Sequence, residues 1–157
     1  DLVANLRSYS RIDARGKFEF VDLAQGVEAT LVLLRPLIPK DVEIKVRMGN
    51  IPSVECNLGH MNQVFMNLIV NAVDAVRDRP PSSTPGMVEI SADRNEDGVI
   101  VRVKDNGMGI SAEDQSRIFD PFFTTKEVGK GTGLGLTICQ RIIEAHHGKI
   151  DLDSQLG

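Results

Sequence analysis

The sequence predicts an α/β fold, a two-layer α/β sandwich in which a mixed sheet packs against helices. Residues 58–76 place apolar side chains every three or four positions, as one face of a long helix does. Residues 42–46 alternate apolar and charged side chains, and residues 99–104 are rich in β-branched residues, which is typical of strands. Long amphipathic helices beside a β-rich half favour a sheet with helices packed on it.

The composition is that of an ordinary globular protein and argues against nucleic-acid binding. The chain has 157 residues, enough for one domain, with 41% hydrophobic and 25% charged residues. Its net charge is −4, Trp is absent and only one Tyr is present, so neither a basic phosphate-binding surface nor base stacking is expected. Cys56 and Cys139 are far apart and not in metal-ligand spacing. No secretory signal or membrane-spanning run is visible, which predicts a soluble, cytoplasmic domain without fixing the membrane status of a longer parent protein.

In the first half of the chain, strands and helices are predicted in alternation. The chain begins inside a helical pattern that runs to residue 13, which suggests a fragment of a longer protein. Asp22 is a suitable N-cap for a helix that ends before Pro36 and Pro39. The predicted elements are strands at 17–21, 42–46 and 53–56 and helices at 23–34 and 58–76.

In the second half, a hairpin is followed by a long loop and a last helix. Residues 95–98 are turn formers between two strand patterns, and residues 111–132 are rich in Gly and Thr around one aromatic cluster. A loop this long within a domain is usually functional. The predicted elements are strands at 87–92, 99–104 and 150–152 and a helix from 134 to about 145. Gly148 is the signal that terminates this helix.

A carboxylate, an amide and two glycines follow the strand at 99–104, in the segment Asp105-Asn106-Gly107-Met108-Gly109-Ile110. A carboxylate at the end of a strand can accept a hydrogen bond from an exocyclic amine such as that of adenine. The glycines allow a flat ligand to approach the backbone. The alternative is an ordinary turn, since Asp, Asn and Gly dominate turns.

The long helix carries a polar face opposite its apolar one, formed by His60, Gln63, Asn67, Asn71 and Asp74. Asn is a poor helix former, so two Asn residues one turn apart call for an explanation. An amide oxygen is a suitable ligand for Mg²⁺, which takes one or two protein oxygens together with substrate phosphates. The alternative is a solvated polar face of the kind most amphipathic helices have.

A glycine-rich run, Gly129-Lys130-Gly131-Thr132-Gly133-Leu134-Gly135-Leu136, leads directly into the last helix. Free N–H groups and the helix dipole at such a start can bind phosphate. The run lacks the Walker A spacing, and no βαβ unit surrounds it. Alone, it is also compatible with a flexible loop.

Together and in this order, these motifs resemble the ATP-binding domain of sensor histidine kinases, in the group that includes DNA gyrase, Hsp90 and MutL. Residues 67–72 resemble the N box, 105–109 the G1 box, 119–123 the F box and 131–135 the G2 box. The resemblance covers residues 15–157 and implies a Bergerat-type ATP-binding fold. Thr124-Thr125-Lys126 after the F box is most similar to the nitrogen-regulation (NtrB-like) class.

The resemblance implies a role for each motif, with ATP and Mg²⁺ as cofactors. Asp105 would bind the adenine amino group, Asn71 would coordinate Mg²⁺, and Asn67 would lie by the phosphates. Residues 111–130 would form a lid over ATP, anchored by the buried rings of Phe119, Phe122 and Phe123. Lys126 and Lys130 are candidates for phosphate contact. The residues expected at the nucleotide are Asn67, Asn71, Asp74, Asp105, Gly107, Gly109, Ile110, Phe119, Thr124, Thr125, Lys126, Lys130, Gly131, Thr132, Gly133, Leu134, Gly135 and Leu136.

Two departures from the family pattern bear on the chemistry. Many relatives have Lys where Asp74 stands, so the phosphate contacts near Asp74 are open. Gyrase-like ATPases have a water-activating Glu at the position of Asn67, and an amide cannot serve as that base. Phosphotransfer to a protein is therefore favoured over hydrolysis. The alternatives are a nucleotide-gated module or ATPase of the Hsp90, MutL or gyrase type, and a degenerate domain that binds a response regulator without nucleotide.

None of the three histidines, His60, His146 and His147, is placed like a phosphoacceptor, so no catalytic residue is assigned in this chain and the acceptor is expected before residue 1. Residues 1–14 would be the end of the dimerisation helix or a linker, and 15–157 the catalytic domain without its last strand. The resemblance implies two partners, a His-containing dimerisation domain of the same protein and a response regulator receiver domain. The full-length protein would be a homodimer with histidine kinase activity.

Overall fold

The computed structural model describes residues 17–127 and 131–156, which belong to two compact units. One unit contains Phe18–Gly109, and the other contains Ile110–Gln155. The helical pattern predicted before residue 13 and the boundary predicted at residue 14 lie outside the described residues. Among the described residues, no helix is both long enough and apolar enough to cross a membrane.

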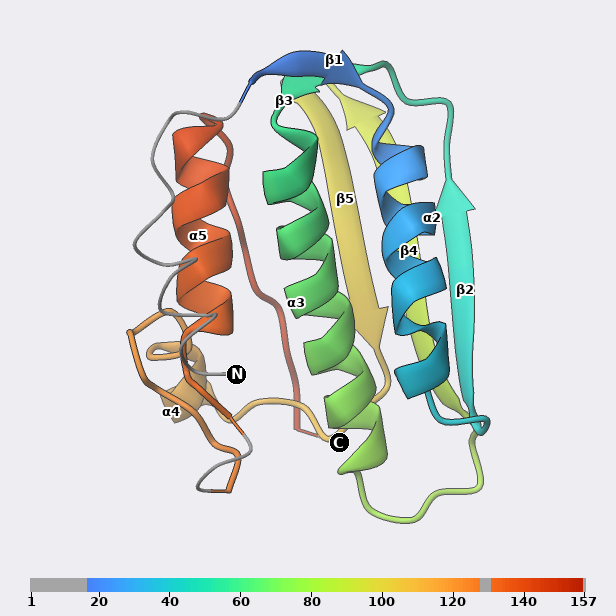
Figure 1. Ribbon diagram of the computed structural model, residues 1–157. Coiled ribbons are helices and arrows are strands. Elements are labelled where there is room, and N and C mark those ends of the chain that lie inside the picture. The colour runs from blue at the N-terminus through green and yellow to red at the C-terminus, as the bar shows by residue number, and fades with distance from the viewer. Residues whose placement is uncertain (1–16, 128–130, 157) are drawn as a thin grey trace. The chain divides into compact units, whose positions relative to one another are not determined.

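The Phe18–Gly109 unit is built on a three-stranded mixed sheet with strand order β2-β4-β5 (Figure 1). β2 (Val42–Met48) runs parallel to β4 (Gly86–Asn95), and β4 runs antiparallel to β5 (Gly98–Asp105). The β4–β5 connection confirms the predicted hairpin, with Asn95 paired to Gly98 across the turn. At the other end of the hairpin, Asp105 is paired with Val88. This predicted site residue therefore lies at the end of the β4–β5 ladder.

Two parallel helices, α2 (Leu23–Leu34) and α3 (Leu58–Arg77), cover one face of this sheet (Figure 1). The predicted two-layer α/β arrangement is therefore confirmed. Alternate residues of β4 face the helices, and Val88, Ile90 and Ala92 are fully buried. The apolar face of α3 is buried as predicted, apart from half-buried Leu68; its buried members are Met61, Val64, Phe65, Ile69, Ala72, Val73 and Val76.

Side-chain caps fix where both helices begin. The predicted cap Asp22 accepts a hydrogen bond of 2.9 Å from the Ala24 N–H, and Asn57 accepts one of 3.1 Å from the His60 N–H. α2 ends at Leu34, one residue before the short 3-10 helix η1 (Arg35–Leu37) that contains Pro36.

A two-stranded antiparallel ribbon, β1 (Glu19–Val21) with β3 (Val54–Cys56), precedes the long helix α3. Both strands confirm the sequence-based predictions at 17–21 and 53–56. Cys56 at the end of β3 is a buried free thiol, and its burial raises the pKa of the thiol above the ordinary value. The thiol is therefore unreactive rather than catalytic.

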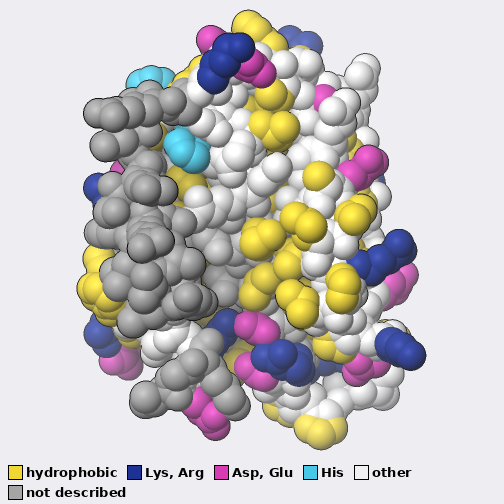
Figure 2. All heavy atoms as spheres, in the orientation of Figure 1, with side chains coloured by type: hydrophobic (Ala, Val, Ile, Leu, Met, Phe, Trp, Pro, Cys, Tyr) yellow, Lys and Arg dark blue, Asp and Glu magenta, His cyan; other side chains and the backbone are white. Residues whose placement is uncertain are grey.

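Figure 2 shows hydrophobic side chains gathered on the face of the molecule that carries α2 and α3. On these two helices, the exposed large hydrophobic residues are Val32, Leu33, Leu58, Met66 and Val70. α2 has a single charged residue, Glu28, so this outer face is unusually apolar for an exposed helix pair.

The Ile110–Gln155 unit contains α4 (Ala112–Gln115) and α5 (Gly135–Ala145). α5 confirms the predicted last helix, and Thr137, Ile138, Cys139 and Ile142 form its buried side. The prediction of an unbroken loop over 111–132 was wrong, because Ser111 accepts a hydrogen bond from the Asp114 N–H and starts α4.

The strand predicted at 150–152 is also absent from the described part of the chain. Asp151 and Leu152 are exposed, and Asp151 forms an ion pair of 3.0 Å with Lys149. The nearby Ser154 instead holds the start of the unit, because its hydroxyl accepts from the Ile110 N–H and its carbonyl accepts from the Gln115 side chain. A segment with an alternating sequence forms a strand only where another strand is present to pair with it.

Candidate functional site

Asp105 is the last residue of β5, and its carboxylate shapes the segment that follows. The Gly107 N–H donates a hydrogen bond of 2.8 Å to Asp105 Oδ1. No hydrogen bond to Oδ2 is recorded within the residues that the structure describes. The segment is thus a local turn, as the alternative interpretation held, but it also leaves one carboxylate oxygen available to a ligand.

Gly107 packs directly on the backbone of α3. The Met108 N–H donates a hydrogen bond of 3.1 Å to the Ala75 carbonyl, and a Cβ at position 107 would lie 2.6 Å from that carbonyl oxygen. No L side chain fits such a contact without moving the helix. Gly109 has a φ of 73°, a conformation that favours glycine. Both glycines therefore have a structural reason to be glycine, and the segment is tied to the helix that carries Asn71.

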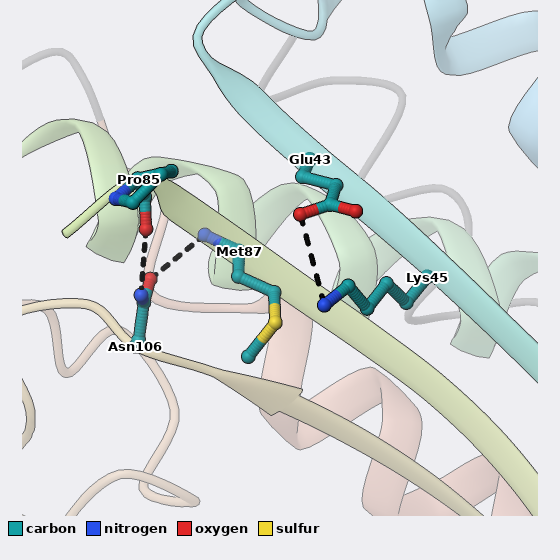
Figure 3. A network of polar contacts seen from close by, with 5 residues as sticks. All are labelled: Glu43, Lys45, Pro85, Met87 and Asn106. Carbon is teal, nitrogen blue, oxygen red and sulfur yellow. Dashed lines mark hydrogen bonds and ion pairs between the residues drawn. The ribbon is translucent and has the colours of Figure 1, made fainter.

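Asn106 was not among the predicted site residues, yet it forms the densest set of contacts in this segment (Figure 3). Its side-chain oxygen accepts from the Met87 N–H at 2.8 Å, and its side-chain nitrogen donates to the Pro85 carbonyl at 2.9 Å. From the sequence, an Asn between Asp and Gly indicates only a turn, because Asn is a common turn residue. Its side-chain contacts could not be predicted from that position.

The predicted polar face of α3 is half-buried at Asn67, Asn71 and Asp74. Asp74 is paired with Arg77, whose guanidinium lies 2.8 Å from the Asp74 carboxylate. Asn71 has no recorded side-chain hydrogen bond within the described ranges 17–127 and 131–156, so its amide oxygen can accept a ligand. No cluster of three or more His, Cys, Asp or Glu residues suited to a metal occurs in the described part of the chain.

In the other unit, the prediction that the Phe122 ring is buried was wrong. Phe122 is 63% exposed, and its φ of 66° is rare for a residue with a side chain. The buried side chain of this stretch is Ile118, which is 7% exposed and was not predicted. Phe119 and Phe123 are half-buried, and the Arg117 guanidinium lies 4.6 Å from the centre of the Phe123 ring.

Backbone contacts join the aromatic cluster to the glycine-rich run. The Phe122 N–H donates a hydrogen bond of 2.9 Å to the Gly133 carbonyl, and a Cβ at Gly133 would lie 2.6 Å from Phe122 Cα. Gly133 also has a φ of 66°. A Cβ at Gly131 would lie 2.5 Å from the Thr124 hydroxyl and 3.1 Å from Lys126 Cβ. The structure therefore brings the predicted residues Thr124, Lys126, Gly131 and Gly133 together.

The start of α5 has the features expected of an anion site. Leu134 occupies the N-cap position, and no side chain caps the helix. The Thr132 hydroxyl accepts a bond of 3.3 Å from the Leu134 N–H, so this hydroxyl shapes the approach to the helix. The Leu134 side chain is fully buried and Leu136 is half-buried, so a ligand would meet their backbone rather than the Leu134 side chain.

Three further predicted site residues are Thr125, Ile110 and Lys130. Thr125 is exposed, and Ile110 is half-buried with its N–H bonded to Ser154 at 3.0 Å. Lys130 lies outside the described residues.

Comparison with known proteins decides the family. Residues 57–157 match the family described as histidine kinase-, DNA gyrase B- and HSP90-like ATPase. The chain belongs to this ATPase family. The four predicted motifs all fall within the matched residues.

Similar members of the ATPase family include sensor kinases of bacteria. The chain is 37% identical to the sensor kinase CckA of Brucella abortus and 35% identical to the histidine-protein kinase AtoS of Escherichia coli, over 99% of its own length in each case. It spans only 18% of CckA and 25% of AtoS.

Solved structures agree with the fold. The structure of full-length ShkA in complex with AMPPNP matches 99% of the chain and 33% of ShkA, with a TM-score of 0.83 and 25% identity. The catalytic domain of histidine kinase ThkA matches 83% of the chain and 82% of that domain, with a TM-score of 0.69 and 32% identity. ThkA in complex with its response regulator TrrA matches 94% of the chain and 40% of ThkA, with a TM-score of 0.72 and 29% identity. These likenesses support a histidine kinase catalytic domain within the ATPase family.

Proposed function

We propose that this chain is the ATP-binding catalytic domain of a two-component sensor histidine kinase, and that it presents the γ-phosphate of ATP to a His on a separate dimerisation domain. The observation that carries this proposal is the fixed carboxylate of Asp105. One of its oxygens is engaged by the Gly107 N–H, and the other is available at the end of β5.

The adenine base would bind at this end of the sheet. Asp105 Oδ2 would accept a hydrogen bond from the 6-amino group, and a charged acceptor gives such a bond more strength than a neutral one. Gly107 and Gly109 leave this segment without side chains at two positions, so a flat ring can approach its backbone.

The triphosphate would be held by the glycine-rich run and by α5. The dipole of α5 and the backbone N–H groups at its start favour phosphate oxygens, and Gly131, Gly133 and Gly135 leave the run without side chains at three positions. The side chains of Thr124, Thr125, Lys126 and Lys130 are the proposed further contacts.

The donor set also fits Mg²⁺, which prefers oxygen ligands and keeps several phosphate or water oxygens. Asn71 would supply the amide oxygen, beside Asn67 on the same face of α3. When bound, Mg²⁺ neutralises charge on the phosphates and so supports phosphoryl transfer. Asn67 cannot act as a general base, which favours transfer to a protein acceptor over hydrolysis of ATP.

The proposed partners are the His-containing dimerisation domain of the same protein and a response regulator receiver domain, in a homodimeric, cytoplasmic assembly. The likeness to ThkA, which was solved with its response regulator, supports the second partner. The proposal of the NtrB-like class rests on Thr124-Thr125-Lys126 alone.

Calorimetric titration with ATP, with and without Mg²⁺, tests the proposal. The wild-type chain is expected to bind, and Asp105→Asn is expected to bind roughly 10- to 100-fold more weakly, since it loses a hydrogen bond to a charged group. Asp93→Asn is the matched control, because Asp93 lies on the same hairpin and pairs with Arg102 at 3.0 Å. Equal affinity in Asp105→Asn and wild type, with both folded by circular dichroism, would contradict the adenine role.

A further inference from the structure

We infer that Asn106 is a positioning residue that sets the purine specificity of this site, because its side chain fixes the direction in which Asp105 presents its free carboxylate oxygen. The inference rests on the proposed ATP site and names what makes that site selective for a 6-amino purine. It concerns only residues of the Phe18–Gly109 unit.

The side chain of Asn106 extends the sheet beyond its last residue. The β4–β5 ladder ends where Asp105 pairs with Val88. One residue further along, the Asn106 backbone N–H donates to the Met87 carbonyl at 3.2 Å. The Asn106 side chain then accepts from the Met87 N–H and donates to the Pro85 carbonyl, as a peptide group of a longer strand would (Figure 3).

A second group holds Asn106 from its other side. The Arg79 guanidinium donates to the Asn106 carbonyl at 3.3 Å and to the Thr84 carbonyl. Arg79 follows the end of α3, so this contact joins that helix, the entry into β4 and the Asp105 segment. Asn106 is therefore bonded through its backbone N–H, its carbonyl and both side-chain polar atoms.

These bonds act on Asp105 because the two residues are adjacent. The Gly107 N–H holds one oxygen of Asp105, and the Met108 N–H holds the segment on Ala75. Asn106 supplies the remaining attachment, on the side of the sheet. With all three attachments in place, the free oxygen has one direction, and a hydrogen bond weakens steeply when its angle is poor.

The chemistry of Asn suits this position. Met87 N–H needs an acceptor and the Pro85 carbonyl needs a donor, and a short amide side chain supplies both. A carboxylate at 106 would face the Pro85 carbonyl without a proton and would add a second negative charge beside Asp105. Asn106→Ala is thus the cleaner test, since it removes the two bonds and adds no charge.

The experiment compares ATP with inosine triphosphate, in which a 6-oxo group replaces the 6-amino group. A well-directed carboxylate accepts from the amine and repels the oxo group, so the ratio of the two affinities reports the direction of the Asp105 oxygen. Affinities are measured by titration of wild type, Asn106→Ala and Asn95→Ala, and thermal unfolding is followed for each. Asn95 is the matched control, because it accepts from the Asp97 N–H at 3.1 Å at the opposite end of the same hairpin.

Asn106→Ala is expected to reduce the ATP-to-inosine-triphosphate affinity ratio roughly fivefold or more, which is within the range for a misdirected hydrogen bond to a charged group. Asn95→Ala is expected to leave the ratio unchanged even where it lowers the unfolding temperature. A purely structural role for Asn106 would lower stability without moving the ratio, and that result would overturn the inference.

Arg79→Met keeps the inference testable if Asn106→Ala does not fold. This substitution removes the donors to the Asn106 and Thr84 carbonyls but retains an apolar stem. The ATP-to-inosine-triphosphate affinity ratio is expected to fall by about twofold, because the lost bond to Asn106 is weaker and partly exposed. An unchanged ratio in Arg79→Met would then overturn the inference. Wild type that binds both nucleotides equally, or neither, would overturn the proposed adenine site itself, which separates failure of the proposed function from failure of the Asn106 role.

Discussion

The two halves of the proposed nucleotide site are built in different ways. The Asp105–Gly109 segment is fixed by backbone and amide bonds to β4 and α3, and Gly107 touches the Ala75 backbone. The stretch from Ser111 to Leu134 is held mainly by hydrogen bonds, such as Phe122 to Gly133, and Ile118 and Leu134 are its only buried side chains among the described residues. The base-binding half is thus pre-formed, whereas the phosphate-binding half has little packing to define it without a ligand.

The largest expected effect comes from Gly107→Ala. The new Cβ would meet backbone atoms of Ala75, which cannot move aside, so we expect a loss of about 3 kcal/mol in the free energy of unfolding, at the upper end for overpacking. The measurement is chemical denaturation followed by circular dichroism.

Gly59→Ala is the control for this substitution, because Gly59 is exposed on the same helix and its Cβ would meet only the Asn57 side chain at 3.3 Å. Similar stabilities for the two variants would contradict the close contact between Gly107 and α3. The Asp105–Gly109 segment would then not be held in place by α3.

Ile118→Ala against Phe122→Ala tests how the second half is anchored. Ile118 is buried, so its truncation is expected to cost about 2 kcal/mol in unfolding free energy. Phe122 is largely exposed, and its truncation is expected to change stability by less than about 0.5 kcal/mol. The reverse order, measured by denaturation, would restore the sequence-based prediction that the Phe122 ring is an anchor.

Asn71→Ala probes the metal contact in the pre-formed half. We expect ATP affinity to fall about tenfold with Mg²⁺ present and much less in a chelator, because the amide oxygen acts through the metal. The control is Asn62→Ala, another Asn of α3, whose side-chain oxygen is buried against Gly26. Equal weakening of Asn71→Ala in both conditions would show that its role is not metal binding.

The smallest effect is expected for Thr132→Val. It removes the hydroxyl that accepts from the Leu134 N–H before α5, and loss of such a bond is worth about 0.5–1 kcal/mol. Thr125→Val is the matched control, since Thr125 is exposed and forms no recorded hydrogen bond in the described part of the chain. If both variants unfold at the same denaturant concentration, the Thr132 bond does not contribute to stability.

The sequence predicted those parts of the molecule whose signals are local. Apolar spacing predicted α3, alternation predicted the hairpin, and Asp22 predicted the start of α2. Ser111 followed by Asp114 is also a local signal, typical of a helix start, although the sequence-based prediction did not include α4.

The errors lie where the outcome depends on residues far apart in the chain. Phe122 is turned outward because its backbone pairs with Gly133, and aromatic composition cannot show which ring faces inward. Residues 150–152 have the alternation of a strand but no pairing partner among the described residues. Asn106 was overlooked because its partners, Pro85 and Met87, are about twenty residues earlier in the chain.

Amide hydrogen exchange, resolved by residue with and without Mg-ATP, tests the comparison most directly. Asn106, Gly107 and Met108 have bonded amides in the absence of ligand, so we expect them to be protected before nucleotide is added. Thr124 and Thr125 are exposed, and we expect their amides to exchange rapidly and to become protected when Mg-ATP binds. Rapid exchange at Gly107 and Met108 without nucleotide, or equal protection of both stretches, would contradict the difference between a pre-formed adenine-binding segment and a ligand-ordered phosphate-binding one.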